Sequence, residues 1–90
     1  MNIIWDNEKN EWLILNRNIS FEEISEKIQT GKYIDIIENP TRENQQYFIL
    51  EIDNYIWVIP FIIDEEENII LKTAYPSRKM TRKYGEKNEK

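Results

Sequence analysis

The spacing of the hydrophobic residues changes once along the chain, and the change separates a helical part from a strand part. Before the change, apolar residues recur every three to four positions, at Phe21, Ile24 and Ile28. That spacing is typical of one buried helix face. Ser20 and Glu23 form a capping box at the start of this segment, and Gly31 supplies a stop signal after it. A helix is therefore predicted between Ser20 and Gly31.

Two further elements are predicted upstream of this helix. Residues 2–5 form a short apolar run that suits an opening strand. Asp6 offers an N-cap carboxylate, so a first helix is predicted over residues 7–17. Three of its side chains are available for burial, namely Trp12, Leu13 and Leu15.

Beyond Gly31 the apolar residues follow the two-residue period of β-strands. Strands are predicted at residues 32–38, 47–52, 55–63 and 69–74. They are connected by a polar loop over 39–44, the hairpin pair Asp53-Asn54 and an acidic turn over 64–68. The strand over 55–63 is apolar on both faces, which predicts cover on both sides. Pro60 cannot donate to a neighbouring strand, so a bulge or a strand edge is expected there.

This order predicts a single α+β domain over residues 1–90. Two N-terminal helices pack on a roughly four-stranded antiparallel sheet, and a short basic helix ends the chain. Residues 86–90 are expected to fray. The predicted core consists of Phe21, Ile24, Ile28, Phe48, Leu50, Trp57, Ile59 and Phe61.

The composition limits the chemistry available to the chain. It has no cysteine, so a disulfide framework and a thiolate zinc site are excluded. It has no histidine, so the usual general base near neutral pH is missing. Ninety residues bury too small a core for a large cofactor, and none is expected.

The N-terminus lacks signal-peptide features and the longest apolar run, residues 56–63, is too short for a bilayer. We therefore expect a soluble cytoplasmic protein with no membrane partner.

Positively and negatively charged residues are concentrated in different parts of the chain. Residues 72–90 contain seven Lys or Arg and two Asp or Glu, a net of +5, whereas residues 1–71 carry a net of −10. If the basic segment is helical, Arg78 and Arg82 share one face and Ser77 caps the helix. Arginine forks bind phosphate oxygens and helix N-terminal amides add to an anion site, so one interpretation is a phosphate clamp. The other is a solvated basic tail that balances the acidic body.

Several short motifs together resemble the BrnT family of type II toxins. They are Ile4-Trp5-Asp6, then Ile19-Ser20-Phe21-Glu22-Glu23, then Ser77-Arg78-Lys79-Met80-Thr81-Arg82. The resemblance covers nearly the whole chain in order and spacing. It implies a RelE-like fold, metal-independent ribonuclease activity and neutralisation by a cognate antitoxin protein in a possible hetero-oligomer.

Candidate residues for that activity lie mainly near the C-terminus. Arg78 and Arg82 would hold the scissile phosphate, and Lys72 or Tyr84 would move protons, Tyr84 as a phenol whose pKa is lowered by nearby cations. For RNA binding the candidates are Ser77, Lys79, Lys83 and Arg42. The alternatives are an outward strand lysine at Lys72, a solvated loop at Arg42, and simple packing of the tyrosines. No metal site is expected.

Two other functions remain open at this point. A non-catalytic acidic inhibitor that binds a basic nucleic-acid-binding protein fits the net charge of −5 and the missing histidine. A degenerate toxin that retains only antitoxin binding lies between the two. The acidic run over residues 64–67 could bind a metal or a basic partner segment, although a solvated turn is the simplest interpretation. Trp5, Trp12 and Trp57 are interpreted as core or rim residues, and an exposed Trp would indicate an interface.

Overall fold

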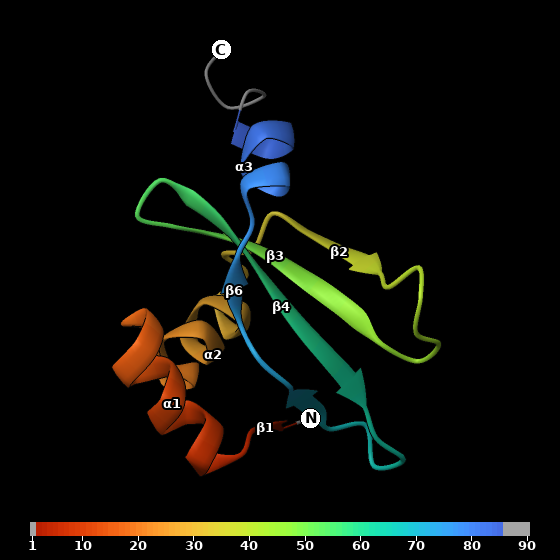
Figure 1. The fold of residues 1–90 in the computed structure, drawn as a ribbon. Coiled ribbons are helices and arrows are strands. Elements are labelled where there is room, and N and C mark those ends of the chain that lie inside the picture. The colour runs from red at the N-terminus through yellow and green to blue at the C-terminus, as the bar shows by residue number, and fades with distance from the viewer. Residues whose placement is uncertain (1, 86–90) are drawn as a thin grey trace.

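The computed structural model describes residues 2–85, so the predicted fraying of residues 86–90 lies outside the described part. Within residues 2–85 the chain forms three helices and six strands, in the order β1, α1, α2, β2 to β6 and α3 (Figure 1). The strands are β1 (Ile3–Ile4), β2 (Asp35–Glu38), β3 (Gln46–Ile52), β4 (Tyr55–Ile63), β5 (Ile69–Leu71) and β6 (Tyr75–Pro76). The helices are α1 (Asn7–Arg17), α2 (Phe21–Gln29) and α3 (Arg78–Gly85). No helix in the described part is long and apolar enough to cross a bilayer.

The helix boundaries agree with the capping residues. The Asp6 carboxylate accepts the Glu8 N–H, and the Ser20 hydroxyl accepts the Glu23 N–H at 3.1 Å. Gly31 follows α2 with a φ of +73°, a conformation that glycine adopts without a Cβ penalty. In α1 only part of the expected burial is found, because Leu13 is fully buried while Trp12 is 41% exposed and Leu15 is 85% exposed. The expectation for Leu15 was wrong because the buried face of α1 runs through Asn10 and Leu13.

The sheet confirms the antiparallel meander of β2, β3, β4 and β5 and adds two strands to it. The order is β1-β5-β4-β3-β2, and β1 pairs with β5 in parallel, so the sheet is mixed rather than purely antiparallel. β2 is shorter than predicted. The strand predicted over residues 69–74 is interrupted after Leu71, and the chain then returns to β4 as β6.

Pro60 explains that interruption. On one side β4 pairs with β3 along its length, but on the other it pairs with β6 at residues 57–58 and with β5 at residues 61–63. The Pro60 carbonyl accepts the Lys72 N–H at 2.9 Å, and a strand residue directs its nitrogen to the same side as its carbonyl. The Pro60 nitrogen, which has no hydrogen to donate, therefore faces the segment between β5 and β6. The expected break is found in the neighbouring strand, and β4 itself continues.

The sheet is covered on both faces, as the doubly apolar β4 predicted. On the α1–α2 face a cluster of buried side chains includes Phe21, Ile24, Ile28, Phe48, Leu50, Ile59 and Phe61, and Trp57 packs against it while only partly buried. On the other face α3 covers a smaller cluster of Ile49, Ile56, Val58 and Tyr84. The predicted core is thus confirmed apart from full burial of Trp57, and the second cluster was not predicted.

Candidate nucleic-acid interface

α3 is fixed to the sheet so that its four cations face solvent. The Ser77 hydroxyl accepts the Met80 N–H at 3.1 Å, which confirms Ser77 as the cap of this helix. The Thr81 hydroxyl accepts the Ile56 N–H of β4 at 2.9 Å, and Tyr84 is buried. The outward positions are then left to Arg78, Lys79, Arg82 and Lys83, all of which are exposed.

The charge of α3 is unfavourable for an isolated helix. Arg78 and Lys79 occupy its first turn, and no acidic residue lies there. A helix N-terminus carries partial positive charge, so cations at this end cost stability and a bound anion would compensate them. The placement favours the phosphate-clamp interpretation over a charge-balancing tail, because a tail that paired with the acidic body would need no such concentration at the helix start.

The α3 face of the sheet is organised in rows across the strands. Ile37 pairs with Tyr47, Tyr47 pairs with Pro60, and Lys72 is hydrogen-bonded to Pro60. Directly paired residues share a sheet face, so Lys72 belongs to the row that contains Tyr47. Its side chain is exposed. From the strand rise of about 3.3 Å per residue, this row lies roughly 13 Å along β4 from the level of Ile56, whose carbonyl accepts the Ser77 N–H.

Two tyrosines lie on this face, Tyr47 in the row of Lys72 and Tyr75 in the next row toward α3. Tyr75 pairs with Val58 in the row next to that of Tyr47, and both tyrosines are partly buried. Burial raises the pKa of Tyr75, and the adjacent Tyr47 hydroxyl raises it further. The Tyr75 ring therefore remains neutral at physiological pH. Neutral aromatic rings flanked by cations are the usual surface for stacking nucleic-acid bases.

Tyr84 lies in a different environment from the one expected for a catalytic phenol. It is only 7% exposed, and its hydroxyl donates to Asp35 Oδ2 at 3.0 Å. Burial, and then the hydrogen bond to the Asp35 carboxylate, raise the pKa of Tyr84. The expected lowering by nearby cations is wrong, because the carboxylate and the low-polarity surroundings both favour the neutral phenol. Its position indicates a structural role that holds α3 to β2.

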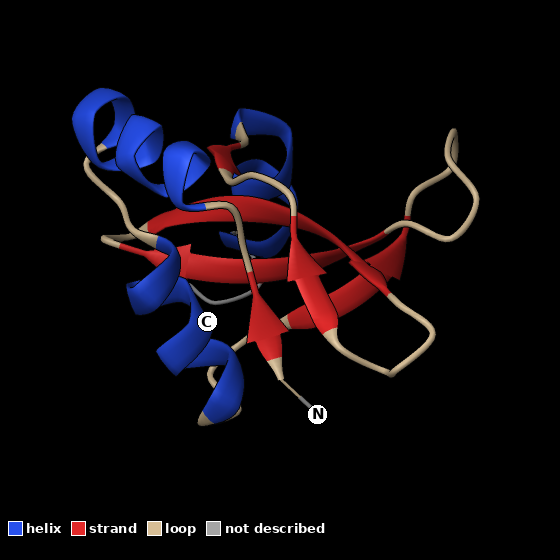
Figure 2. Ribbon diagram, turned by 90° about the horizontal axis from the view of Figure 1, so that it is seen from below, coloured by secondary structure: helices blue, strands red, loops and turns tan. Residues whose placement is uncertain are grey.

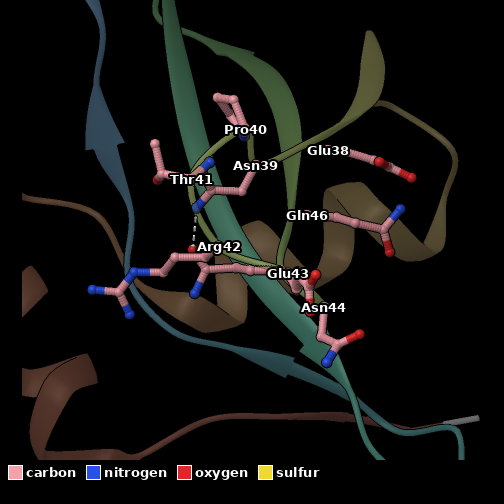
Figure 3. Close-up of a pocket in the computed structure, with 9 residues that line it drawn as sticks. Glu38, Asn39, Pro40, Thr41, Arg42, Glu43, Asn44 and Gln46 are labelled. Carbon is pink, nitrogen blue, oxygen red and sulfur yellow. Dashed lines mark hydrogen bonds between the residues drawn. The ribbon is translucent and has the colours of Figure 1, made fainter.

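Arg42 lies in the loop between β2 and β3. Asn39 closes this loop through its side chain, which donates to Gln45 Oε1 at 2.7 Å. The loop residues surround an open polar hollow of about 510 Å³, and Arg42 is directed away from Glu38 and Gln46 (Figure 3). The loop rises on the same side of the sheet as α3 (Figure 2). It follows the Glu38 end of β2, however, whereas α3 contacts Asp35 at the other end.

The acidic run over residues 64–67 forms a self-contained turn between β4 and β5. Asp64 Oδ1 accepts the N–H groups of Glu66 and Asn68 at 2.9 and 2.8 Å. The hydrogen bond from the Asn68 backbone is the main cause that lowers the pKa of Asp64. Within residues 2–85 no group of three or more carboxylates is placed to hold a metal ion. The turn lies at the opposite end of β4 from α3 (Figure 1).

Sequence reasoning missed several residues of this surface. Tyr47 was read only as a strand residue, and Asp35 was not singled out, because their partners Tyr75 and Tyr84 lie far along the chain. Arg17 was also missed: its guanidinium donates to the Ala74 carbonyl and lies over the Trp12 ring at 4.8 Å. It thereby ties the end of α1 to the connection between β5 and β6. Only contacts between distant segments identify these roles.

Comparison with known proteins supports the fold. No protein-family model matches the chain, and no curated protein matches its sequence. Among solved structures, the fold is similar to the crystal structure of the Brucella abortus ribonuclease toxin BrnT, with a TM-score of 0.64 over 86% of this chain and 96% of that chain. The two sequences are 19% identical. The chain therefore has the fold of BrnT, as the sequence resemblance implied.

Proposed function

We propose that the protein is an endoribonuclease toxin of a type II toxin–antitoxin system, active in the cytoplasm and neutralised by a cognate antitoxin protein. The observation that carries the proposal is the exposure of four cations on α3, in a fold shared with a ribonuclease toxin. Net charge alone argues against binding RNA, since the chain carries −5 overall. The separation of the acidic 64–67 turn from α3 supports the proposal, because the four carboxylates of the turn lie at the opposite end of β4 from the basic helix and repel an RNA bound there less.

RNA would lie across the α3 face of the sheet. Arg78 and Arg82 would grip the scissile phosphate, with Ser77, Lys79 and Lys83 on the neighbouring backbone. Tyr75 and Tyr47 would offer their rings to one or two bases. The Lys72 side chain would reach the scissile phosphate from the far side of Tyr75, and Arg42 on its loop would contact a phosphate further along the strand. Single-stranded RNA suits this surface, because paired bases could not stack on the tyrosines.

The cleavage we propose is a transesterification. The 2′-hydroxyl oxygen attacks the adjacent phosphorus, the bond from phosphorus to the 5′ oxygen breaks, and the products carry a 2′,3′-cyclic phosphate and a 5′-hydroxyl. The two arginines would stabilise the charge that develops on the phosphate oxygens. The 2′-hydroxyl proton would pass to a solvent water, and the Lys72 ammonium would give a proton to the departing 5′ oxygen. Tyr84 would hold α3 in place without exchanging a proton with RNA.

Incubation of the purified protein with single-stranded RNA tests this proposal. We expect cleavage products with 2′,3′-cyclic phosphate ends, and an unchanged rate after addition of a chelator. A rate abolished by the chelator would contradict the metal-independent mechanism. In cells, expression of the chain alone should arrest growth, and co-expression of the protein encoded by the adjacent gene should relieve the arrest.

The second candidate is a non-catalytic acidic protein that binds a basic partner, and the net charge of −5 together with the absence of histidine favours it. The same experiment separates the two. A protein that neither cleaves RNA nor arrests growth, but binds a basic nucleic-acid-binding protein with strong salt dependence, would support this candidate and contradict the first.

A further inference from the structure

β2 is an edge strand with open backbone groups. It pairs with β3 on one side, and within residues 2–85 no strand pairs with its other side. The Asn39 N–H donates to the Gln45 carbonyl at 3.0 Å, on the side of β2 that faces β3. Successive residues of a strand direct their backbone groups to opposite sides. The backbone groups of Ile36 and Glu38 therefore point away from β3. Asp35 Oδ1 already accepts a hydrogen bond from the Ile36 N–H at 2.8 Å. The Ile36 carbonyl and both backbone groups of Glu38 remain as a template for another strand.

An apolar hollow of about 350 Å³ lies on the α1–α2 face of the sheet, and its lining extends from β2 and the end of α2 to β5 and β1. Its lining includes Ile3, Ile28, Tyr33, Ile36, Phe48 and Ile69. Tyr33 and Ile36 are 37% and 39% exposed, and Ile34, next to them in the chain, is 40% exposed. Residues 33–36, at the start of this edge strand, thus include three large, partly exposed apolar side chains. This is unusual for a free edge, which proteins commonly protect with Lys or Pro. We call the hollow and the outer edge of β2 together the β2 groove.

The charged residues near the β2 groove indicate the net charge of the molecule that would bind there. Glu38 follows Ile36 by two residues and therefore lies on the same face of β2. The turn of residues 64–67, with one Asp and three Glu, directly precedes Asn68 and the groove residue Ile69. Lys32 lies near the opposite end, just before Tyr33. The β2 edge thus ends in the Glu38 carboxylate, and the 64–67 carboxylates adjoin the β5 side of the hollow, within a body of residues 1–71 that carries a net charge of −10.

We propose that the β2 groove binds an extended segment of a basic partner protein, which adds to β2 as a further strand. Its alternate apolar side chains would contact Tyr33 and Ile36 at the β2 side of the hollow, and a Lys or Arg side chain would lie near Glu38. A second copy of this chain would fit poorly, because its own β2 would bring Asp35 and Glu38 against the same carboxylates. Nucleic acid would be repelled for the same reason. This binding is independent of RNA cleavage and requires no catalytic residue.

A synthetic peptide tests the proposal directly. The probe is a peptide of alternating Val and Lys, about ten residues long to match a natural strand. Titration calorimetry without RNA should show binding, and the corresponding Val–Glu peptide should not bind. A Val–Lys peptide that is N-methylated at every residue keeps its charge but loses its backbone donors, so it should bind much more weakly. Equal binding of the methylated peptide would contradict strand addition.

Matched substitutions locate the binding. Ile36→Arg should weaken binding about tenfold, whereas Ile14→Arg, at an isoleucine of α1 that is 47% exposed, should not. Glu38→Lys should weaken binding, and Glu11→Lys on α1 should change it little. Equal effects at the control positions would overturn the proposal.

Two measurements on the wild-type protein remain informative even if Ile36→Arg fails to fold. In amide NMR spectra, the Val–Lys peptide should shift signals of residues 33–38 and of the groove lining. Shifts confined to α1 would overturn the proposal. Sedimentation of the free chain should show a monomer. A dimer that Glu38→Lys strengthens, by removing like-charge repulsion at the edge, would assign the groove to a second copy and overturn the proposal.

Discussion

The Tyr84 hydroxyl donates to Asp35 Oδ2 across 49 residues of sequence, and this bond joins the last turn of α3 to the first residue of β2. The same carboxylate accepts the Ile36 N–H through Oδ1. Asp35 therefore supports two surfaces at once: the basic helix proposed to hold RNA, and the sheet edge proposed to bind a partner. Its position makes it the contact most sensitive to changes at either surface.

Removing this bond should affect stability more than chemistry. Tyr84→Phe keeps the ring in the core and removes one hydrogen bond to a charged group, so we expect a loss of about 1–2 kcal/mol in the free energy of unfolding. RNA cleavage by the folded variant should persist. Urea unfolding of Tyr84→Phe, Asp35→Asn and the double variant should reveal coupling between the two positions. Complete loss of cleavage in a Tyr84→Phe protein that remains folded would instead establish a catalytic role for this hydroxyl.

The raised pKa values of Tyr84 and Tyr75 predict a loss of stability in alkali. In both cases the fold favours the neutral phenol, so the folded-state pKa lies above the ordinary value of 10.0. The resulting stabilisation is complete below pH 10 and is lost as the pH rises through the folded-state values. Urea unfolding as a function of pH should show this decline. Tyr84→Phe should make it shallower, whereas Tyr33→Phe, at an exposed tyrosine, should leave it unchanged.

Local signals were sufficient to predict most elements of this fold. The caps at Asp6, Ser20 and Ser77 act within a few residues of their own helices, and Asp53-Asn54 takes positive φ values of 55° and 66° as a tight hairpin requires. The apolar residues on both faces of β4 also predicted that the sheet is covered on both faces. Each of these signals is contained in a window of about ten residues, so a single sequence reveals it.

Features that depend on distant partners were not predictable in the same way. The strand predicted over residues 69–74 breaks because Pro60 of the neighbouring strand has no donor to offer there. Tyr84 was assigned to the active site because of its basic neighbours, but the ring is buried against the sheet and its hydroxyl donates to Asp35 of β2. Leu15 was expected inside because it is apolar, whereas a buried polar residue, Asn10, occupies the inner face of α1.

Asn10 joins the two N-terminal helices and should be costly to remove. It is only 6% exposed; its Oδ1 accepts the Phe21 N–H at 2.7 Å and its Nδ2 donates to Glu22 Oε1 at 2.8 Å. Asn10→Ala leaves the buried N–H without a partner, so we expect a loss of about 1–3 kcal/mol in the free energy of unfolding. Asn16→Ala on the same helix removes only an exposed bond to the Trp12 carbonyl and should cost less than about 0.5 kcal/mol. Similar losses for both variants would show that Asn10 does not join the helices.

The arginine pair of α3 provides the sharpest test of the proposed activity. Arg78→Ala with Arg82→Ala removes two exposed guanidinium groups, so we expect RNA cleavage to fall at least about a hundredfold, because each group is proposed to stabilise charge in the transition state. The melting temperature should stay unchanged or rise slightly, since Arg78 opposes the helix dipole. Growth arrest in cells should disappear with the cleavage.

A control variant that loses the same charge elsewhere distinguishes a specific role of the two arginines from the effect of the net charge of the protein. Lys27→Ala with Lys32→Ala removes the same two positive charges from the region at the end of α2. It should retain cleavage within about twofold, because long-range attraction between exposed charges is screened at physiological salt. If both double variants lose cleavage equally, total charge rather than α3 controls the reaction. If the arginine variant retains full cleavage, α3 does not hold the scissile phosphate.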